Sequence, residues 1–420
     1  LFGGPSQLET FDMKPDAPSA VRGPYQPTRS RSDGLLVCEH LPKLARMSDR
    51  YAVVRTVHHP QNDHNACHYI QTGHPMPPAP RGAAGVDATD RDWPAMGSVI
   101  EYLDHQAAGG RPRAVPSYVY LPNRLGHIEG YDRLGQYGGW LGRGYDALAT
   151  DIRKQSKEDN PYFRVCSDPE LDFRIKGMAG RDQLTLDRLD RRRSLLTQFD
   201  SERRKLDGSR PAGEYDAYQQ AALGLVAAGK IHEALDIRRE KEAVRDRYGR
   251  HLFGQSMLMG RRMIEAGARF VTVLWDAPDG YSWDSHRNSD DVGKHLLPGL
   301  DQSLSALLSD MGDRGLLQET LVVCLGEMGR TPKGKAGWGR DHWSYCFPAL
   351  FAGAGIRGGA VYGKSDAEAA FPVEHPVSPE DLACTLFDAL GVDPHSTIPD
   401  RESRPTSLIE GGRPLRELFG

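Results

Sequence analysis

Carboxylates and imidazoles that suit a metal ion are concentrated in three stretches of this sequence. The first is Gly326–His342, with Glu327 near its start and the pair Asp341-His342 at its end. The apolar run Leu321–Leu325 precedes it and has the length and β-branching of a buried strand. Because ligands of open α/β sheets bind beyond the carboxyl ends of strands, we expect these side chains to face one site. A hard cation or a phosphate-like group suits that arrangement, and a solvated loop is the alternative.

The second stretch, His58–Tyr69, contains four histidines and directly follows the strand candidate Tyr51–Val57. On a helix that begins near Asp63, His64 and His68 are four residues apart and share a face. Such a pair can chelate a metal, and the start of the helix can help to hold an anion. Asp63 is alternatively a plain N-cap of that helix.

The third stretch is Trp283–Asn288, which comes after the strand candidate Ala268–Leu274. Asp284 and His286 are two residues apart, so an extended loop can steer their side chains to neighbouring positions. A carboxylate with an imidazole is a common half-site for a divalent metal. We therefore expect Asp284 and His286 to act together.

The beginning of the sequence adds two further carboxylates. Leu1–Gly4 is typical of the tail of a strand followed by a turn, and an initiating Met is missing. We expect a segment upstream of Leu1 that was removed. Glu9 and Asp12 follow closely enough to reach a site at the end of that strand. A solvated loop or a helix cap is the alternative for both.

The elements that must position these residues follow an α/β order. Residues 1–170 and 267–420 are predicted as two parts of one α/β core, and residues 171–266 as a helical insertion or cap without strand signals. The amphipathic helix His295–Gly312 lies between two strand candidates, which favours a right-handed parallel crossover. Helices are expected in the insertion at Arg181–Arg204, Tyr215–Ala228, Ile231–Arg239 and Glu240–Ala266.

Composition excludes several classes of protein. The chain has 420 residues and a formal net charge of -4, so it lacks the basic excess of a nucleic-acid-binding protein. No apolar run approaches the roughly 20 residues that span a bilayer. The six cysteines are scattered without a CxxC pair, which excludes a zinc ribbon. Cys324 and Cys384 lie in apolar runs and are expected to be core residues.

Taken together, the motifs resemble a known family. They are GGPSQLETFD (Gly3–Asp12), NDHNACHYIQTGH (Asn62–His74), WDSHRN (Trp283–Asn288), GEMGRTP (Gly326–Pro332), GRDHW (Gly339–Trp343) and AGAGIRGGAVYGKSD (Ala352–Asp366). This combination resembles the bacterial family catalogued as domain of unknown function 1501, and the resemblance spans nearly the whole chain. It implies kinship with the alkaline phosphatase and sulfatase superfamily. The implied fold is α/β, a three-layer sandwich with a mostly parallel central sheet and a helical insertion.

The resemblance also implies roles for the candidate residues. Glu9 or Asp12 would supply the first carboxylate, and Asp63–Asn65 would stand at the place of the nucleophile. Asp284 and His286 would form the middle group of metal ligands. Glu327 would stand where the superfamily has an Asp-His pair, and His342 would be the last histidine. Two departures follow. Glu327-Met328 replaces the pair, so His64 would have to supply the missing imidazole. No Ser, Thr or Cys stands at the nucleophile place, and a metal-bound hydroxide could attack instead.

These features predict a metal-dependent hydrolase of sulfate or phosphate esters that acts on a small anionic substrate. The resemblance implies export by a twin-arginine leader to the periplasm or beyond the cell. One or two divalent ions, Zn or Ca, are expected on Glu9, Asp12, His64, Asp284, His286, Glu327, Asp341 and His342. Catalytic roles are expected for Asp63, His64, Asn65 and Arg330.

Two alternatives stay open at this point. Arg330 and Arg340 either bind substrate oxygens with their guanidinium groups or form ion pairs with Glu327 or Asp341. The whole chain is alternatively a non-catalytic binding or scaffold protein that retains the fold, because fold kinship alone does not establish chemistry.

Overall fold

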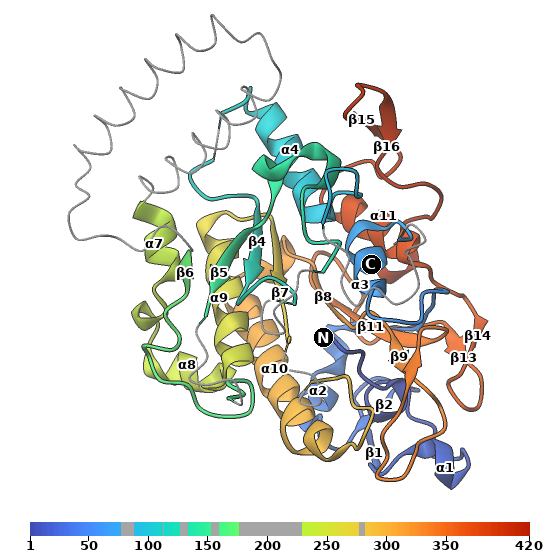
Figure 1. The fold of residues 1–420 in the computed structure, drawn as a ribbon. Coiled ribbons are helices and arrows are strands. Elements are labelled where there is room, and N and C mark those ends of the chain that lie inside the picture. The colour runs from blue at the N-terminus through green and yellow to red at the C-terminus, as the bar shows by residue number, and fades with distance from the viewer. Residues whose placement is uncertain (77–87, 112, 127–132, 153–158, 176–228, 277–281) are drawn as a thin grey trace, which may run out of the picture.

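Two four-stranded sheets form the centre of the molecule (Figure 1). The computed structural model describes all 420 residues except 77–87, 112, 127–132, 153–158, 176–228 and 277–281. In the first sheet the strand order is β12 (Val361–Tyr362), β3 (Ala52–Val57), β11 (Phe347–Ala352) and β8 (Val322–Leu325). In the second it is β6 (Arg174–Ile175), β5 (Leu148–Asp151), β4 (Tyr118–Leu121) and β7 (Phe270–Val273).

Both sheets are of mixed type. In the first, β12 runs parallel to β3, whereas β11 runs antiparallel to both β3 and β8. In the second, β4 runs parallel to β5 and β7, and β6 is antiparallel to β5. Parallel and antiparallel pairs are thus equally represented in these described sheets, and a mostly parallel sheet is not what they show. The strand candidates at β3, β7 and β8 are confirmed as strands.

Helices cover both faces of the sheets. In β4, Val119 and Leu121 pack into the largest apolar cluster with α9 (Leu252–Ala266) and α10 (Leu297–Asp313). Tyr118 and Tyr120 pack instead beside Ala95, at the start of α4 (Met96–Ala107). Because successive strand side chains point to opposite faces, α9 and α10 lie on one side of β4 and α4 on the other.

The first sheet shows the same alternation. Val53 and Leu350 join the cluster of α9 and α10, whereas Val54 and Phe351 pack with Leu382 of α11 (Pro379–Ala389). Helix α3 (Ala66–Thr72) packs against α11. The apolar positions of β3, β4 and β11 are therefore buried from two sides.

The described residues include only part of the predicted helical insertion. The expected helices Arg181–Arg204 and Tyr215–Ala228 lie outside the described residues. The expected helix Glu240–Ala266 is wrong as a single element, because it is broken at Gly249 into α8 (Glu242–Tyr248) and α9. Gly249 has a φ of 90°, a backbone conformation that favours glycine. Helix α9 packs on the sheet core, so the domain boundary at residue 266 stays a prediction.

Smaller elements complete the described chain. The remaining helices are α1 (Ser19–Arg22), α2 (Pro42–Arg46) and α7 (Gly229–Leu235). Two-stranded sheets pair β1 (Pro27–Arg29) with β2 (Leu36–Cys38), β9 (Gly329–Arg330) with β10 (His342–Trp343), β13 (Lys364–Ser365) with β14 (Pro372–Glu374), and β15 (Thr397–Pro399) with β16 (Pro405–Ser407). Short 3-10 turns occur at Gln7–Glu9, Ser48–Arg50, Gly139–Leu141, Arg143–Tyr145, Ile237–Arg239, Leu316–Gln318 and Arg416–Leu418, and a π turn at Val292–Leu296 leads into α10. Among the described helices, none has the length and apolar character needed to cross a membrane.

Candidate metal centre

Glu327 is placed by the end of strand β8 and by the first residues of the chain. Its side chain is buried, and its carboxylate accepts hydrogen bonds from the backbone N–H of Gly3 at 2.9 and 3.1 Å. The same carboxylate lies 2.8 Å from Nδ1 of His64. Gly3 has a φ of 109°, and a Cβ there would lie 2.3 Å from the backbone nitrogen of Asp284. Only glycine allows this close approach of the two loops.

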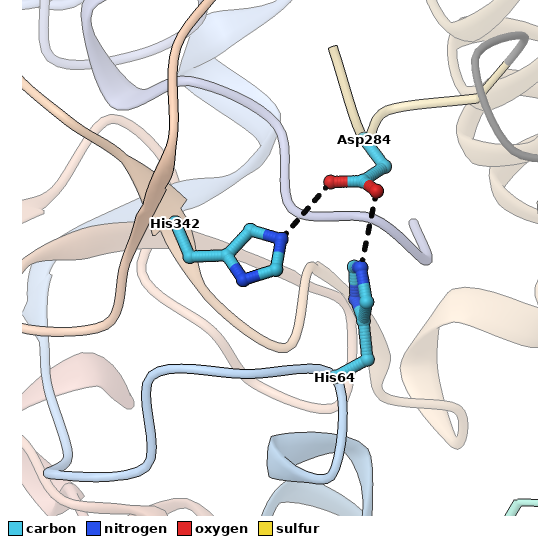
Figure 2. A group of neighbouring side chains, drawn as sticks. All are labelled: His64, Asp284 and His342. Carbon is cyan, nitrogen blue, oxygen red and sulfur yellow. Dashed lines mark hydrogen bonds and ion pairs between the residues drawn. The ribbon is translucent and has the colours of Figure 1, made fainter. Parts of the chain in front are cut away.

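Asp284 lies between two imidazoles that come from distant parts of the chain (Figure 2). Its Oδ1 is 3.1 Å from Nε2 of His342, and its Oδ2 is 3.2 Å from Nε2 of His64. The short β9–β10 sheet, in which His342 is paired with Arg330, brings His342 back to the end of β8. One ligand atom from each of Asp284, His64 and His342 lies within 4.8 Å of the others, a spacing suited to a shared cation.

A third imidazole, that of His286, lies close to the same atoms. Nε2 of His286 lies 3.0 Å from Oδ1 of Asp284 and 3.0 Å from Nε2 of His342. A tetrahedral zinc ion with ligands at about 2.0–2.1 Å places neighbouring ligand atoms about 3.3 Å apart. The three atoms of Asp284, His286 and His342 therefore form a triangle of nearly the size required for one face of such a site. The residues present fit a divalent metal.

The protonation of these groups is strongly coupled to their neighbours. Burial would lower the pKa of His64, but hydrogen bonds to Asp284 and Glu327 and the charges of these carboxylates raise it to about 9. Burial would likewise raise the pKa of Asp284, yet hydrogen bonds from His342 and His64 and the charge of Arg330 lower it. The pKa of Glu327 is also lowered, because His64 outweighs burial. The centre thus holds anionic carboxylates that a cation can share with the imidazoles.

Asp341 stands behind the triangle of ligand atoms. Its Oδ1 lies 3.0 Å from Nδ1 of His286, the ring nitrogen that faces away from Asp284. Lys335 also contacts this carboxylate, and the hydrogen bonds from Lys335 and His286 lower the pKa of Asp341. Histidine ligands of metals commonly donate their second N–H to a carboxylate in this way. Asp341 is therefore placed to orient His286, and Glu327 has the same relation to His64.

Comparison with known proteins identifies the family. The family model described as "Protein of unknown function (DUF1501)" matches residues 1–419. The chain belongs to this family. No curated protein matches it.

Two solved structures are similar to this DUF1501 family member. One is the phosphonate monoester hydrolase SpPMH from Silicibacter pomeroyi, with 14% identity, a TM-score of 0.34, and coverage of 90% of this chain and 71% of that one. The other is BT4656 in complex with its substrate D-glucosamine-2-N,6-O-disulfate, with 11% identity, a TM-score of 0.34, and coverage of 90% and 77%.

Glu9 and Asp12 do not join the other predicted ligands. Glu9 is buried and its carboxylate is 2.8 Å from Nε of Arg340. Asp12 is also buried and is paired with Lys14 at 3.0 Å and Arg55 at 3.4 Å, and it accepts a hydrogen bond from Ser365. The prediction that these carboxylates reach the site is corrected by these contacts. Both are near in sequence to the strand end, but the intervening turn directs them into separate ion pairs.

The two arginines are held by the protein itself. Arg330 is fully buried and donates to the carbonyls of Gly3 and Gly4 and to Asp284. Arg340 is fully buried as well and is bound to Glu9 and to loop carbonyls. The ion-pair alternative therefore describes both, although the carboxylate partners are Asp284 and Glu9 and not those expected. Neither guanidinium is exposed for a substrate, which corrects the substrate-binding role given to Arg330.

The region ahead of α3 divides into surface and core residues. Asp63 is exposed, and its carboxylate accepts hydrogen bonds from Gln61 at 2.7 Å and from the backbone N–H of Asn65 at 2.8 Å, as in a turn that starts a helix. Asn65 is the N-cap residue of α3. His68 is fully buried and contacts the carbonyl oxygen of His74 at 3.1 Å. His64 is therefore the only residue of this group that the structure brings to the other ligands among the described side chains.

Two positioning contacts were not found by sequence reasoning. Nε2 of His59 lies 2.7 Å from the carbonyl oxygen of Glu327 and so fixes that loop. Lys335, in the glycine-rich loop before Asp341, stands at the exposed rim of the site. A lysine between glycines close to an Asp-His pair is a weak signal that could have indicated it.

Proposed function

We propose that this protein is a divalent-metal-dependent hydrolase of small phosphate or sulfate esters. One observation carries the proposal: Asp284, His286, His342 and His64, from three separate loops, converge with their ligand atoms about 3 Å apart. Such convergence has a free-energy cost, because partly buried carboxylates and imidazoles must be desolvated, and perturbed groups of this kind cluster at functional sites. The motif resemblance to the phosphatase and sulfatase superfamily is consistent with ester hydrolysis.

The donor set favours zinc over calcium. Imidazole nitrogens are preferred ligands of zinc and other transition metals, whereas calcium takes six to eight oxygen ligands. Three imidazoles and one carboxylate surround the candidate centre. One metal ion is proposed here, because Glu9 and Asp12 are committed to ion pairs and supply no second set of ligands.

The residues of the site would have three roles, which are metal binding, orientation of the imidazoles and attraction of the substrate. A divalent cation bound at the centre supplies Lewis-acid polarisation of the ester oxygens. Asp284, His286 and His342 would hold the cation, while Asp341 and Glu327 fix the orientation of His286 and His64. Lys335, with a side chain that is 52% exposed, places a positive charge at the rim where an anionic ester would enter.

The deciding experiment combines metal content with turnover. Purified protein loaded with Zn²⁺ is assayed on aryl phosphate, aryl phosphonate and aryl sulfate esters, beside the isosteric variant Asp284→Asn and the variant His342→Ala. His395, which is exposed and remote from the ligand set, supplies the control His395→Ala. Turnover by the wild type and the control, with loss of at least about 100-fold in the two site variants, is expected.

The export of the protein is also proposed, from the motif resemblance alone. Detection of the protein in a periplasmic fraction of cells that express the gene with its natural upstream sequence checks this. If Zn²⁺ binds with one-to-one stoichiometry and no ester in the panel is hydrolysed, the non-catalytic binding protein becomes the better description.

A further inference from the structure

The two central sheets face one another across an apolar slot. We use this name for the cavity of about 610 Å³ whose lining includes Phe270–Leu274 of the β7 segment and Leu321–Glu327 of the β8 segment. Strand β7 is bonded only to β4, and β8 only to β11, so within the described sheets each leaves one edge unpaired. Figure 1 shows these two edge strands in the middle of the molecule. Unpaired edges at the centre of a sheet system are unusual, because such N–H and C=O groups are normally paired.

The apolar side chains of these two edge strands are less buried than those of the strands beside them. All four residues of β7 and all four of β8 are only partly buried, although seven of the eight are apolar, the exception being Thr272. By contrast, their bonded neighbours β4 and β11 are buried at every position. The exposed area of β7 and β8 therefore faces the slot and not a neighbouring strand.

The first hydrogen bond of a new ladder already exists at one end of the slot. The backbone nitrogen of Leu1 donates to the carbonyl oxygen of Leu325 at 2.9 Å. Burial lowers the pKa of this nitrogen, so the position is better suited to a peptide N–H than to a charged amine. Leu1 and Phe2 line the same cavity, and the chain then leads to Gly3 and the candidate metal centre. A strand that ended at Leu1 would therefore run in the same direction as β8.

Strand β8 directs backbone N–H and C=O groups toward the slot. Strand β8 lies opposite β11 from Val322 to Leu325, and the carbonyl oxygen of Leu325 accepts from Leu1 on the slot side. Because the N–H and C=O of one strand residue point to the same side and alternate along the strand, those of Val323 and Leu325 point toward the slot. A strand parallel to β8 would pair with these two residues, continuing the bond that Leu1 makes with Leu325.

We propose that the slot receives an extended, mainly apolar β-strand that precedes Leu1 in the same polypeptide, runs parallel to β8 and joins the two sheets into one. An apolar small molecule would fill the volume but would leave the backbone groups of both edges unpaired. Strand addition satisfies both requirements, since main-chain hydrogen bonds are made while alternate side chains fill the cavity. The proposal does not depend on the hydrolase chemistry, but it explains how Gly3 is held against Glu327.

The test compares two chains of equal length. One carries an extension of about six residues ahead of Leu1, rich in Val, Ile and Thr, which spans roughly the length of β8 and its approach. The other carries an extension of Gly and Ser. Amide hydrogen exchange of residues 270–274 and 321–326 is followed by mass spectrometry. At least about tenfold slower exchange in both segments is expected for the apolar extension only, together with a higher Tm.

A second variant keeps the test decisive. Val323→Pro removes a slot-facing N–H, which is free in the unextended chain and paired once the strand is in place. It is expected to lower the Tm of the chain with the apolar extension more than that of the Gly/Ser chain. Equal exchange and equal Tm in the two extended chains would overturn the proposal. Protection by the same apolar peptide added in trans but not when fused, or protection that coincides with dimerisation in sedimentation, would also overturn it in favour of a partner strand.

Discussion

The Nε2 atoms of His286 and His342 lie 3.0 Å apart, although 56 residues separate them in the chain. Both atoms also lie within 3.1 Å of the same oxygen of Asp284. Two imidazole nitrogens and a carboxylate oxygen at these separations are more stable with a cation between them than without one, because it satisfies all three lone pairs at once. This relationship is the basis of the metal predictions.

Metal affinity should fall in a graded manner across the site. His342→Ala and Asp284→Ala are expected to abolish stoichiometric Zn²⁺ binding, since each removes a ligand atom from the triangle. Asp341→Ala should weaken binding about 10–100-fold, because it only releases the second nitrogen of His286. Isothermal titration calorimetry with Zn²⁺ measures these affinities, with His395→Ala as the control. Equal affinities for the wild type, Asp341→Ala and His342→Ala would remove the case for this centre.

Binding of the metal should also stabilise the folded chain. At a free Zn²⁺ concentration 100 times the dissociation constant, the free energy of unfolding is expected to rise by about 2.7 kcal/mol, since the unfolded chain does not assemble the site. Thermal melts with and without a chelator measure this difference. The same comparison on Asp284→Asn, in which the ligand oxygen is neutral, should show little or no shift.

Lys335 should affect substrate capture more than the chemical step. Its ammonium is exposed at the rim and is paired with Asp341. Lys335→Ala is expected to raise KM several-fold with a smaller change in kcat, because it removes a charge that attracts the anionic ester. Steady-state kinetics at two salt concentrations check this. The difference in KM between the wild type and Lys335→Ala should shrink as the salt concentration is raised. Lys364→Ala, which alters an exposed lysine of β13, is the matched control.

The buried pair Glu9–Arg340 should be structural. Glu9→Ala leaves the guanidinium of Arg340 buried without its carboxylate partner, and the free energy of unfolding is expected to fall by about 3–5 kcal/mol. The fraction that remains folded should bind Zn²⁺ with unchanged affinity, since Glu9 does not contact the centre. Urea denaturation and calorimetry on the same sample separate the two effects. Loss of metal binding by fully folded Glu9→Ala would restore Glu9 as a ligand.

Acid should destabilise the protein through His68. Burial lowers the pKa of His68 from 6.5 to about 4, so the folded protein keeps this imidazole neutral. Between these two pH values the unfolded chain binds a proton that the folded chain does not, so stability falls as the pH falls from about 6.5 to about 4. The contribution of one such group is at most about 3 kcal/mol.

The variant His68→Gln tests this effect. It keeps a hydrogen-bond donor near the carbonyl oxygen of His74 but does not titrate in this range. Urea denaturation at pH 7, 5.5 and 4 should show a smaller loss of stability for the variant than for the wild type. Parallel pH profiles for the two proteins would assign the acid sensitivity to other groups.

Sequence alone determined the family, several of the main strands and most residues of the candidate site. The apolar runs that became β3 and β8 are rich in β-branched residues, and the loops that follow predicted strands supplied Asp284, Glu327 and His342. These are local signals, because strand propensity and the position of a polar side chain after a strand depend on neighbours in the chain. The same signals placed His286 beside Asp284.

Tertiary structure alone decided which carboxylates belong together. Glu9 and Glu327 have the same chemistry and both follow apolar segments, yet one meets Arg340 and the other His64. The tertiary structure also decided that β11 runs antiparallel to β8. It likewise decided that the guanidinium of Arg330 donates its hydrogen bonds to Asp284 and to carbonyl groups. The pairs Glu9–Arg340 and His64–Glu327 join residues that are 331 and 263 positions apart, so they depend on the path of the intervening loops and not on any local pattern.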